Sequence, residues 1–248
     1  MIHHITLTGR SIALACDGTV TTQHGAGGAT GAVYVEASHL TLLHDMRDGE
    51  FYRTGQNSWS PSGWRRLSEA PMRIANEQRR RTADDDPWDD PARHHSAWMA
   101  VLEDASGALL VGCLDGRTPR VRADTAVLEA FTESGGSARW VILPGPATAV
   151  MARYARELGE SLGSRPIEPQ SVWCSWYSYY EGISQEALER EIPQVAELGF
   201  STLQIDDGWE VAVGEWEAGE SFGDGMEAAA TRIREAGMQP GLWVAPFI

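Results

Sequence analysis

The chain has 248 residues, of which 42% are hydrophobic, and its formal net charge is −15 at pH 7. This length and hydrophobic content are sufficient for one large domain or two smaller ones, each with its own core. The excess of carboxylates repels phosphate groups, which excludes nucleic acid and anionic membrane surfaces as main partners.

Cysteine usage and the N-terminus indicate the compartment. The three cysteines, Cys16, Cys113 and Cys174, are scattered and odd in number, so they predict neither a disulfide framework nor a metal site. The N-terminus lacks a basic region followed by an apolar stretch, and no apolar run is long enough to span a bilayer. We therefore expect a soluble cytoplasmic protein with no membrane partner.

Residues 1–145 are predicted to form an N-terminal β-sandwich. Short segments that alternate between apolar and polar residues are separated by Gly, Asp and Ser turns, a pattern typical of antiparallel strands. The expected strands include Ile5–Leu7, Ile12–Leu14, Val33–Val35, Trp98–Val101, Leu109–Leu114 and Ala138–Leu143.

A polar loop at residues 55–64 carries two tryptophans, Trp59 and Trp64. Both rings can plug the end of the sandwich, which is the commoner role of such residues. The other interpretation is a loop that reaches a ligand, and the sequence leaves both open.

Two groups of residues invite a metal interpretation. The acidic loop Asp84–Asp90 lacks the spacing, glycine and distal glutamate of an EF-hand, which favours a solvated loop over a calcium site. Neighbouring side chains such as those of His94 and His95 rarely converge on one ion. No metal site is therefore predicted.

Residues 146–170 are predicted to be a connecting helix and a linker. Met151, Tyr154, Leu158 and Leu162 recur at helical spacing. The segment 165–169 contains two prolines and is expected to be stiff, so we place the domain boundary there.

From residue 171 onward, predicted strands alternate with predicted helices, which implies a parallel sheet with right-handed crossovers. The expected strands are Val172–Trp176, a segment entered from Phe200 that ends at Asp206 and Asp207, and Gly241–Ala245. Ser184 is expected to cap the first helix, and Pro193 is expected to kink or split it.

The number of strands in residues 171–248 is small for the fold they indicate. A strand repeat of about 30–40 residues suits a barrel of eight βα units, which needs roughly 250 residues. The predicted fold class is thus a β-sandwich followed by the first three strands of a (β/α)8 TIM barrel, which is incomplete. The chain ends directly after an apolar strand with no covering helix, which favours truncation over a complete three-stranded layer.

The most informative stretch places Asp206 and Asp207 at the end of an apolar run, followed by Gly208 and Trp209. Acids are rare at such a position unless they have a function. Carboxylates accept hydrogen bonds from hydroxyls and an indole stacks on apolar C–H faces, so this set suits a sugar. A turn or helix cap, with the acid capping and the tryptophan packing, explains the same residues without a ligand.

Residues 172–248 resemble glycoside hydrolase family 36, the α-galactosidases and raffinose synthases. The resemblance rests on four motifs in order, namely Trp173–Tyr177, Gln204–Trp209, Gly214–Trp216 and Gly237–Phe247. In the third motif a glutamate replaces the aspartate of the family. The loop Gln56–Ser60 resembles, less closely, a loop of the family's N-terminal domain.

The resemblance implies a retaining glycoside hydrolase that acts on terminal α-galactosides without metal or organic cofactor. It implies that Asp206 and Asp207 bind galactose hydroxyls and that Trp176 and Trp243 wall the pocket. The expected partner is an α-galactoside oligosaccharide, and self-association through the sandwich is also implied. As further substrate-binding candidates we take the stacking platforms Trp209 and Trp59.

The catalytic groups are not expected in this chain. Retaining hydrolysis needs two carboxyl groups about 5–5.5 Å apart, and in the family these come from the fourth and sixth barrel strands. Neighbouring strand residues point apart, so Asp206 and Asp207 make a poor pair. The nucleophile and acid/base are thus expected beyond Ile248, and this chain alone is expected to be inactive.

Three other functions stay open at this point. A raffinose-synthase-type galactosyltransferase differs in its acceptor rather than in these motifs. A non-catalytic carbohydrate-binding remnant would keep the aromatic platforms and bind sugars. A small α/β protein would use the same acids and aromatics for structure alone.

Overall fold

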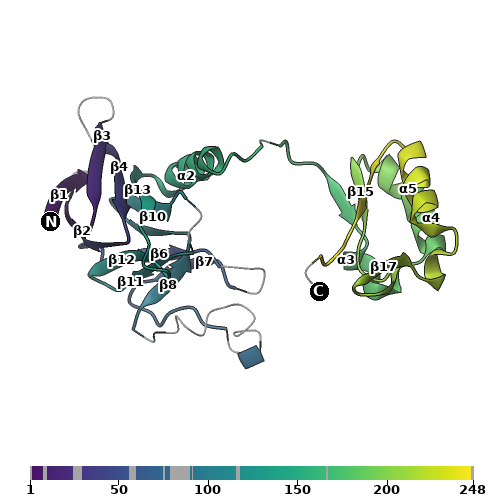
Figure 1. Cartoon of the computed structure of the whole chain (residues 1–248), viewed down its shortest axis with the longest axis horizontal. Coiled ribbons are helices and arrows are strands. Elements are labelled where there is room, and N and C mark those ends of the chain that lie inside the picture. The colour runs from purple at the N-terminus through teal and green to yellow at the C-terminus, as the bar shows by residue number, and fades with distance from the viewer. Residues whose placement is uncertain are drawn as a thin grey trace. The chain divides into compact units, whose positions relative to one another are not determined.

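The computed structural model describes residues 2–7, 10–24, 30–55, 60–74, 76–78, 90, 92–115, 118–165 and 167–246. The chain divides into two compact units, Met1–Arg165 and Pro166–Ile248 (Figure 1). Within the described ranges, none of the helices has the length and apolar character needed to cross a bilayer.

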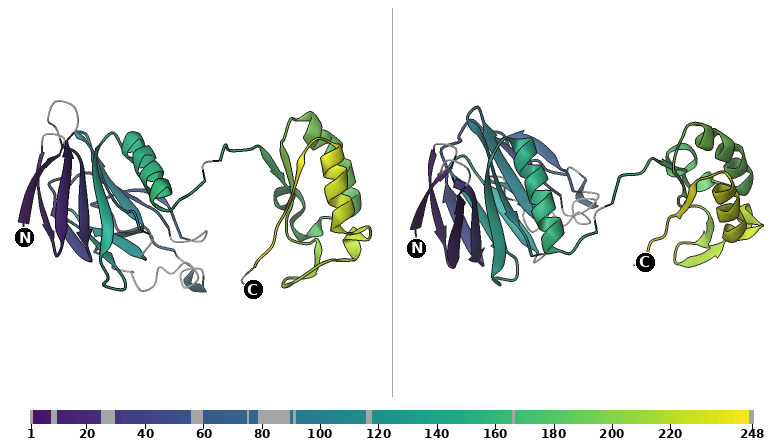
Figure 2. Two further views of the ribbon diagram at one scale, coloured as in Figure 1. Left: turned by 45° about the horizontal axis from the view of Figure 1, so that its top comes forward. Right: turned by 90° about the horizontal axis from the view of Figure 1, so that it is seen from above.

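Unit 1 is a sandwich of two antiparallel sheets (Figure 2), which confirms the predicted β-sandwich. The first sheet contains, in spatial order, β1 (Ile2–Leu7), β2 (Arg10–Cys16), β5 (His39–Leu43), β12 (Val127–Thr132), β11 (Pro119–Ala123) and β8 (His94–Ala97). The second contains β3 (Thr19–His24), β4 (Thr30–Ala37), β13 (Ala138–Gly145), β10 (Gly107–Cys113), β9 (Met99–Asp104), β6 (Glu50–Arg53) and β7 (Gly63–Arg66).

Strand β10 shows how the sequence builds both faces of the second sheet. Leu109 and Val111 point into the core between the sheets, whereas Leu110 points to the opposite face. That face is covered by helix α2 (Ala147–Ser161), whose Val150 and Tyr154 are buried against it. The predicted helix is therefore part of unit 1 and completes its second hydrophobic layer.

Several strands carried too little apolar alternation to be predicted. Strand β8 is the clearest case, because its sequence His-His-Ser-Ala is polar but every residue is buried. Polar contacts make this possible: Ser96 Oγ accepts a hydrogen bond from Thr54 N at 2.8 Å. The ring of His94 lies 5.5 Å from that of Phe51, and His95 Nε2 lies 3.4 Å from Arg53 Nη2.

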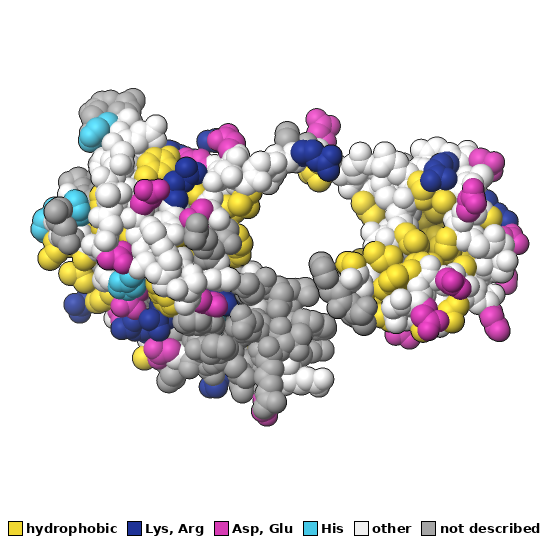
Figure 3. All heavy atoms as spheres, in the orientation of Figure 1, with side chains coloured by type: hydrophobic (Ala, Val, Ile, Leu, Met, Phe, Trp, Pro, Cys, Tyr) yellow, Lys and Arg dark blue, Asp and Glu magenta, His cyan; other side chains and the backbone are white. Residues whose placement is uncertain are grey.

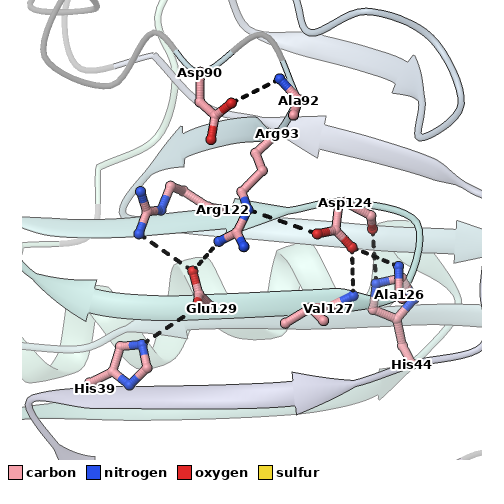
Figure 4. A network of polar contacts seen from close by, with 10 residues as sticks. All are labelled: His39, His44, Asp90, Ala92, Arg93, Arg122, Asp124, Ala126, Val127 and Glu129. Atoms are coloured by element: carbon pink, nitrogen blue, oxygen red, sulfur yellow. Dashed lines mark hydrogen bonds and ion pairs between the residues drawn. The ribbon is translucent and has the colours of Figure 1, made fainter.

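The first sheet carries a polar network, drawn in Figure 4. Glu129 on β12 contacts Arg93 at 2.5 Å and Arg122 at 3.4 Å. Arg93 also approaches Asp124 at 3.8 Å. These half-buried ion pairs tie β12 and β11 to the residue that precedes β8, and each contributes little stability in solvent.

Unit 2 contains a parallel sheet in the order β14 (Val172–Cys174), β15 (Thr202–Ile205) and β18 (Gln239–Leu242). Helices α4 (Gln185–Glu197) and α5 (Gly225–Glu235) lie on one side of it (Figure 1). Leu203 and Ile205 point toward these helices and are buried with Leu188 and Ile233. The predicted alternation of strands and helices is confirmed.

Helix α4 is not split at Pro193, which was one of the two outcomes expected there. Leu188, Ile192 and Val195 pack on the core on both sides of the proline, which faces solvent. The expected ends of two strands were wrong. The first and third strands stop two and three residues earlier than expected, at Cys174 and Leu242. After β14, the chain forms the short helix α3 (Trp176–Tyr179) and the 3₁₀-helix η3 (Tyr180–Gly182).

The remaining elements of unit 2 follow β15. A two-stranded antiparallel hairpin is formed by β16 (Glu210–Ala212) and β17 (Glu215–Ala218). The 3₁₀-helix η4 (Glu220–Phe222) then leads to α5. The predicted cap of α4 is present, since Ser184 Oγ accepts from Ala187 N at 3.2 Å.

Candidate functional site

The candidate site lies at the C-terminal ends of the three parallel strands of unit 2. Side chains alternate along β15, so Gln204 points away from the helix-covered face that holds Leu203 and Ile205. Its register partners are Cys174 on β14 and Gly241 on β18, so all three share one face. Asp206 follows directly after β15 and lies on the same side as Gln204.

This face of the sheet has no helix on it among the described residues. On this face Val172 is 45% exposed, and Gln239 on β18 is exposed as well. On the side of unit 2 that is turned to the viewer, Figure 3 shows exposed hydrophobic side chains with Asp and Glu side chains among and around them. Apolar surface next to carboxylates is the composition expected of a sugar-binding surface.

Asp206 is held by contacts from both β14 and β15. Its Oδ2 atom accepts from Gln204 Nε2 at 2.8 Å and from the Cys174 thiol at 3.2 Å. Its backbone N–H donates to the Oγ of Ser175 at 2.8 Å, and Ser175 is fully buried. The carboxylate is therefore fixed before any ligand arrives.

Asp207 is directed toward other acids. Its backbone N–H donates to Asp206 Oδ1 at 3.0 Å, but its own carboxyl group lies beside Glu210 and near Glu181. Burial raises the pKa of Asp207 to about 6, and the hydrogen bond and charge of Glu210 and the charges of Glu181 and Asp206 add to this. The two aspartates thus have different partners, as their adjacency predicts.

Gly208 is required by the close approach of two backbone segments. Its φ is +107°, and a Cβ atom there would lie 2.4 Å from the carbonyl oxygen of Glu181. Only glycine fits this position without displacement. The contact holds η3 against the turn that carries Asp207.

Trp209 does not have an open ring face. Its side chain is only 2% exposed and packs in the core of unit 2, with its Nε1 donating to the carbonyl oxygen of Trp243 at 3.0 Å. Its ring stacks on Trp216, with centroids 6.2 Å apart. A stacking platform must expose one face to the sugar, and the buried ring of Trp209 does not offer such a face.

Trp243 and Trp176 are both half-buried and follow the ends of β18 and β14. Trp243 continues the ladder, because its N–H donates to Ile205 O at 2.8 Å, and its ring meets that of Trp216 edge-on at 6.0 Å. Trp176 begins α3 and meets Tyr180 edge-on at 5.3 Å. Trp59 lies outside the described residues.

Sequence reasoning missed the residues that orient the acids. Cys174 and Ser175 stand in the first motif and Gln204 opens the second, but their types carry no strong functional signal. The register of the parallel pair β14 and β15 brings Cys174 opposite Gln204. A prediction of that register was the signal that could have identified these residues. Glu181 and Glu210 come close to Asp207 only through the turn at Gly208.

The metal interpretations receive no support. Within the described ranges, no group of three His, Cys, Asp or Glu side chains is placed to hold a metal ion. His94 and His95 are buried in unit 1, and most of the acidic loop, residues 84–89, lies outside the described residues.

A groove of about 1020 Å³ in unit 1 is a weaker candidate site. It runs between β3, β4 and α2 and is lined by Tyr34, Arg153 and Glu157 among others. These groups bond to one another: Arg153 Nε donates to Glu157 at 2.7 Å and the Tyr34 hydroxyl donates to Glu157 at 3.1 Å. Their main role is to fasten α2 to the sheet.

Asp207→Asn is expected to stabilise the protein at neutral pH. A carboxyl pKa raised to about 6 from 3.8 means that the folded state holds the proton more tightly, so stability falls as pH rises between these values. Asparagine mimics the protonated acid and removes this loss. For a half-buried group we expect a gain of roughly 1–2 kcal/mol at pH 7.5.

The check is urea unfolding of both proteins at pH 3 and pH 7.5. The difference in unfolding free energy should shrink toward zero at pH 3, which lies below the pKa of Asp207 in both the folded and the unfolded state. A pH-independent difference would show that the pKa of Asp207 is not raised by folding.

Comparison with known proteins relates the whole chain to α-galactosidases. An α-galactosidase from Thermus thermophilus, solved in complex with p-nitrophenyl α-D-galactopyranoside, is 33% identical with a TM-score of 0.84. The match covers 100% of this chain and 49% of that one. The same enzyme has also been solved in complex with stachyose.

More distant relatives match a shorter stretch. The α-galactosidase AgaA of Geobacillus stearothermophilus is 29% identical over 80 residues, which is 29% of this chain and 11% of that protein. The bifunctional α-galactosidase/sucrose kinase of Mediterraneibacter gnavus is 28% identical over 80 residues, 29% of this chain and 9% of that protein. No family model matches the chain.

The structure of AgaA, a glycoside hydrolase family 36 enzyme, shares the fold. Its TM-score is 0.53 at 14% identity, and the match covers 95% of this chain and 38% of that one. A variant of it has been solved in complex with raffinose. The chain thus spans about half the length, or less, of the relatives it matches.

Proposed function

We propose that this chain, a relative of the family 36 α-galactosidases over about half of their length, forms part of the galactose-binding subsite of a retaining glycoside hydrolase. The ligand in this proposal is a terminal α-galactoside. Asp206 and Asp207 accept hydrogen bonds from the sugar hydroxyls, and Trp176 and Trp243 flank them. In this proposal, the three parallel strands are the first three of a (β/α)8 barrel.

One observation carries the proposal. Asp206 follows β15, the central strand, while Trp176 and Trp243 follow the two strands that pair with it. Active sites of such barrels lie at the C-terminal ends of the strands. A structural cap or turn needs no fixed carboxylate, but Gln204 and Cys174 fix that of Asp206.

Sugar binding and cleavage of the glycosidic bond are assigned to different groups. Asp206 and Asp207 have different partners, which does not suit the nucleophile and acid/base pair of a retaining enzyme. We therefore assign both acids to sugar binding. The two relatives that were solved with stachyose and raffinose support an α-galactoside oligosaccharide as the ligand class.

The test is incubation of the purified 248-residue chain with p-nitrophenyl α-D-galactopyranoside. We expect no release of nitrophenol above that of a heat-denatured sample, at protein concentrations that bind the sugar. Release that disappears in Asp206→Asn or Asp207→Asn would contradict the assignment and place catalysis on these acids.

A further inference from the structure

The hydrogen bonds around Asp206 determine which of its atoms remain available. An ionised carboxylate offers about four acceptor positions on its two oxygens. Gln204 Nε2 and the Cys174 thiol occupy Oδ2, at 2.8 and 3.2 Å. The backbone N–H of Asp207 occupies one position on Oδ1, at 3.0 Å. With the donors that the described residues supply, one acceptor position remains, and it is on Oδ1.

We propose that Gln204 and Cys174 are positioning residues that hold Oδ2 of Asp206. As a result, Asp206 offers the sugar one hydrogen-bond acceptor, its Oδ1 atom. This inference rests on the proposed function for its ligand. The arrangement of donors around Asp206 does not depend on that function. Neither residue needs to touch the sugar.

Neighbouring strands place Gln204 for this role. Gln204 and Asp206 are two residues apart on the same face, which brings the amide to the carboxylate. On β18 its partner is Gly241, where a Cβ atom would come within 3.1 Å of Gln204 Cβ. The absence of a side chain there leaves room for the amide of Gln204 to lie over the sheet.

Cys174 completes the arrangement from the other side. It is the register partner of Gln204 on β14, and its Sγ lies 3.8 Å from Gln204 Nε2. Burial raises the pKa of the Cys174 thiol, and its hydrogen bond to Asp206 raises it further. The thiol therefore stays protonated at neutral pH and can act as a donor.

A first experiment tests the arrangement without a sugar. Peptide-resolved alkylation with iodoacetamide is followed from pH 7 to 10 in the wild type and in Asp206→Asn. Loss of the carboxylate should lower the pKa of Cys174 and raise its alkylation rate at pH 8 by about threefold or more. Cys16, whose thiol donates to the carbonyl oxygen of Gly18 at 3.6 Å, is the internal control.

A second experiment measures affinity for methyl α-D-galactopyranoside. Cys174→Ala and Gln204→Ala should each weaken binding by about five- to tenfold, which is less than the loss of the charged acceptor itself because neither side chain touches the sugar. Cys174→Ser keeps a donor and should stay within about threefold of the wild type. A residue with only a structural role would instead change the melting temperature and leave the affinity unchanged.

The two experiments separate this inference from the proposed function. An unchanged alkylation profile for Cys174 in Asp206→Asn, or wild-type affinity in both alanine variants, would overturn the positioning role. If the wild type itself binds no galactoside, the proposed function fails. The alkylation profile alone then supports or overturns the positioning of Asp206.

Discussion

Asp206→Asn should abolish most of the affinity of this chain for α-galactosides. The substitution keeps the shape of the side chain and removes its charge. A hydrogen bond to a charged acceptor contributes about 1.5–3 kcal/mol, so the dissociation constant should rise roughly 10- to 100-fold. Calorimetric titration with methyl α-D-galactopyranoside measures the change.

Folding should be little affected by this substitution. The backbone N–H of residue 206 still donates to the buried Ser175 hydroxyl, which anchors the turn. We expect the unfolding free energy to change by less than about 1 kcal/mol. Glu197→Gln, at the exposed end of α4, is the matched control for loss of one negative charge. Equal affinities of Asp206→Asn and Glu197→Gln would show that Asp206 does not bind the sugar.

Gly208→Ala should produce the largest loss of stability. The new Cβ would lie 2.4 Å from the Glu181 carbonyl oxygen, and the φ of +107° is unfavourable for any residue with a side chain. The Cβ atom has no rotational freedom and the carbonyl oxygen belongs to the backbone, so relief requires displacement of η3 or of the turn. We expect a destabilisation of about 3 kcal/mol or more in urea unfolding.

Gly223→Ala provides the comparison for this prediction. Gly223 has a φ of −59°, and no atom lies within 4 Å of the position of its missing Cβ. The same substitution there should change stability by less than about 1 kcal/mol. If the two variants unfold at the same urea concentration, the close approach of Gly208 to Glu181 is not present in solution.

The parts of the fold that the sequence predicts are those built from apolar alternation. Leu109–Leu110–Val111 of β10 is apolar on both faces because one face meets the other sheet and one meets α2. His94–Ala97 of β8 is buried through hydrogen bonds and contacts from Thr54, Phe51 and Arg53. Such partners are distant in sequence, so local pattern cannot reveal them.

The same limit applies to the candidate site. The acids stand out because Asp206 and Asp207 end an apolar run, and their different directions follow from adjacency. Trp209 shows the ambiguity of a lone tryptophan: the type suggests a platform, but its burial depends on Trp216 and on the carbonyl group of Trp243. The roles of Gln204 and Cys174 depend on strand register, which becomes visible only once β14 and β15 are paired.

The most direct test of the central claim is a calorimetric titration of the 248-residue chain with two epimers. Methyl α-D-galactopyranoside and methyl α-D-glucopyranoside differ only in the orientation of the C4 hydroxyl. We expect saturable binding of the galactoside, at least tenfold weaker binding of the glucoside, and loss of the difference in Asp206→Asn. Absence of saturable binding to either sugar, or equal affinity for both, would contradict a galactose subsite at Asp206 and Asp207.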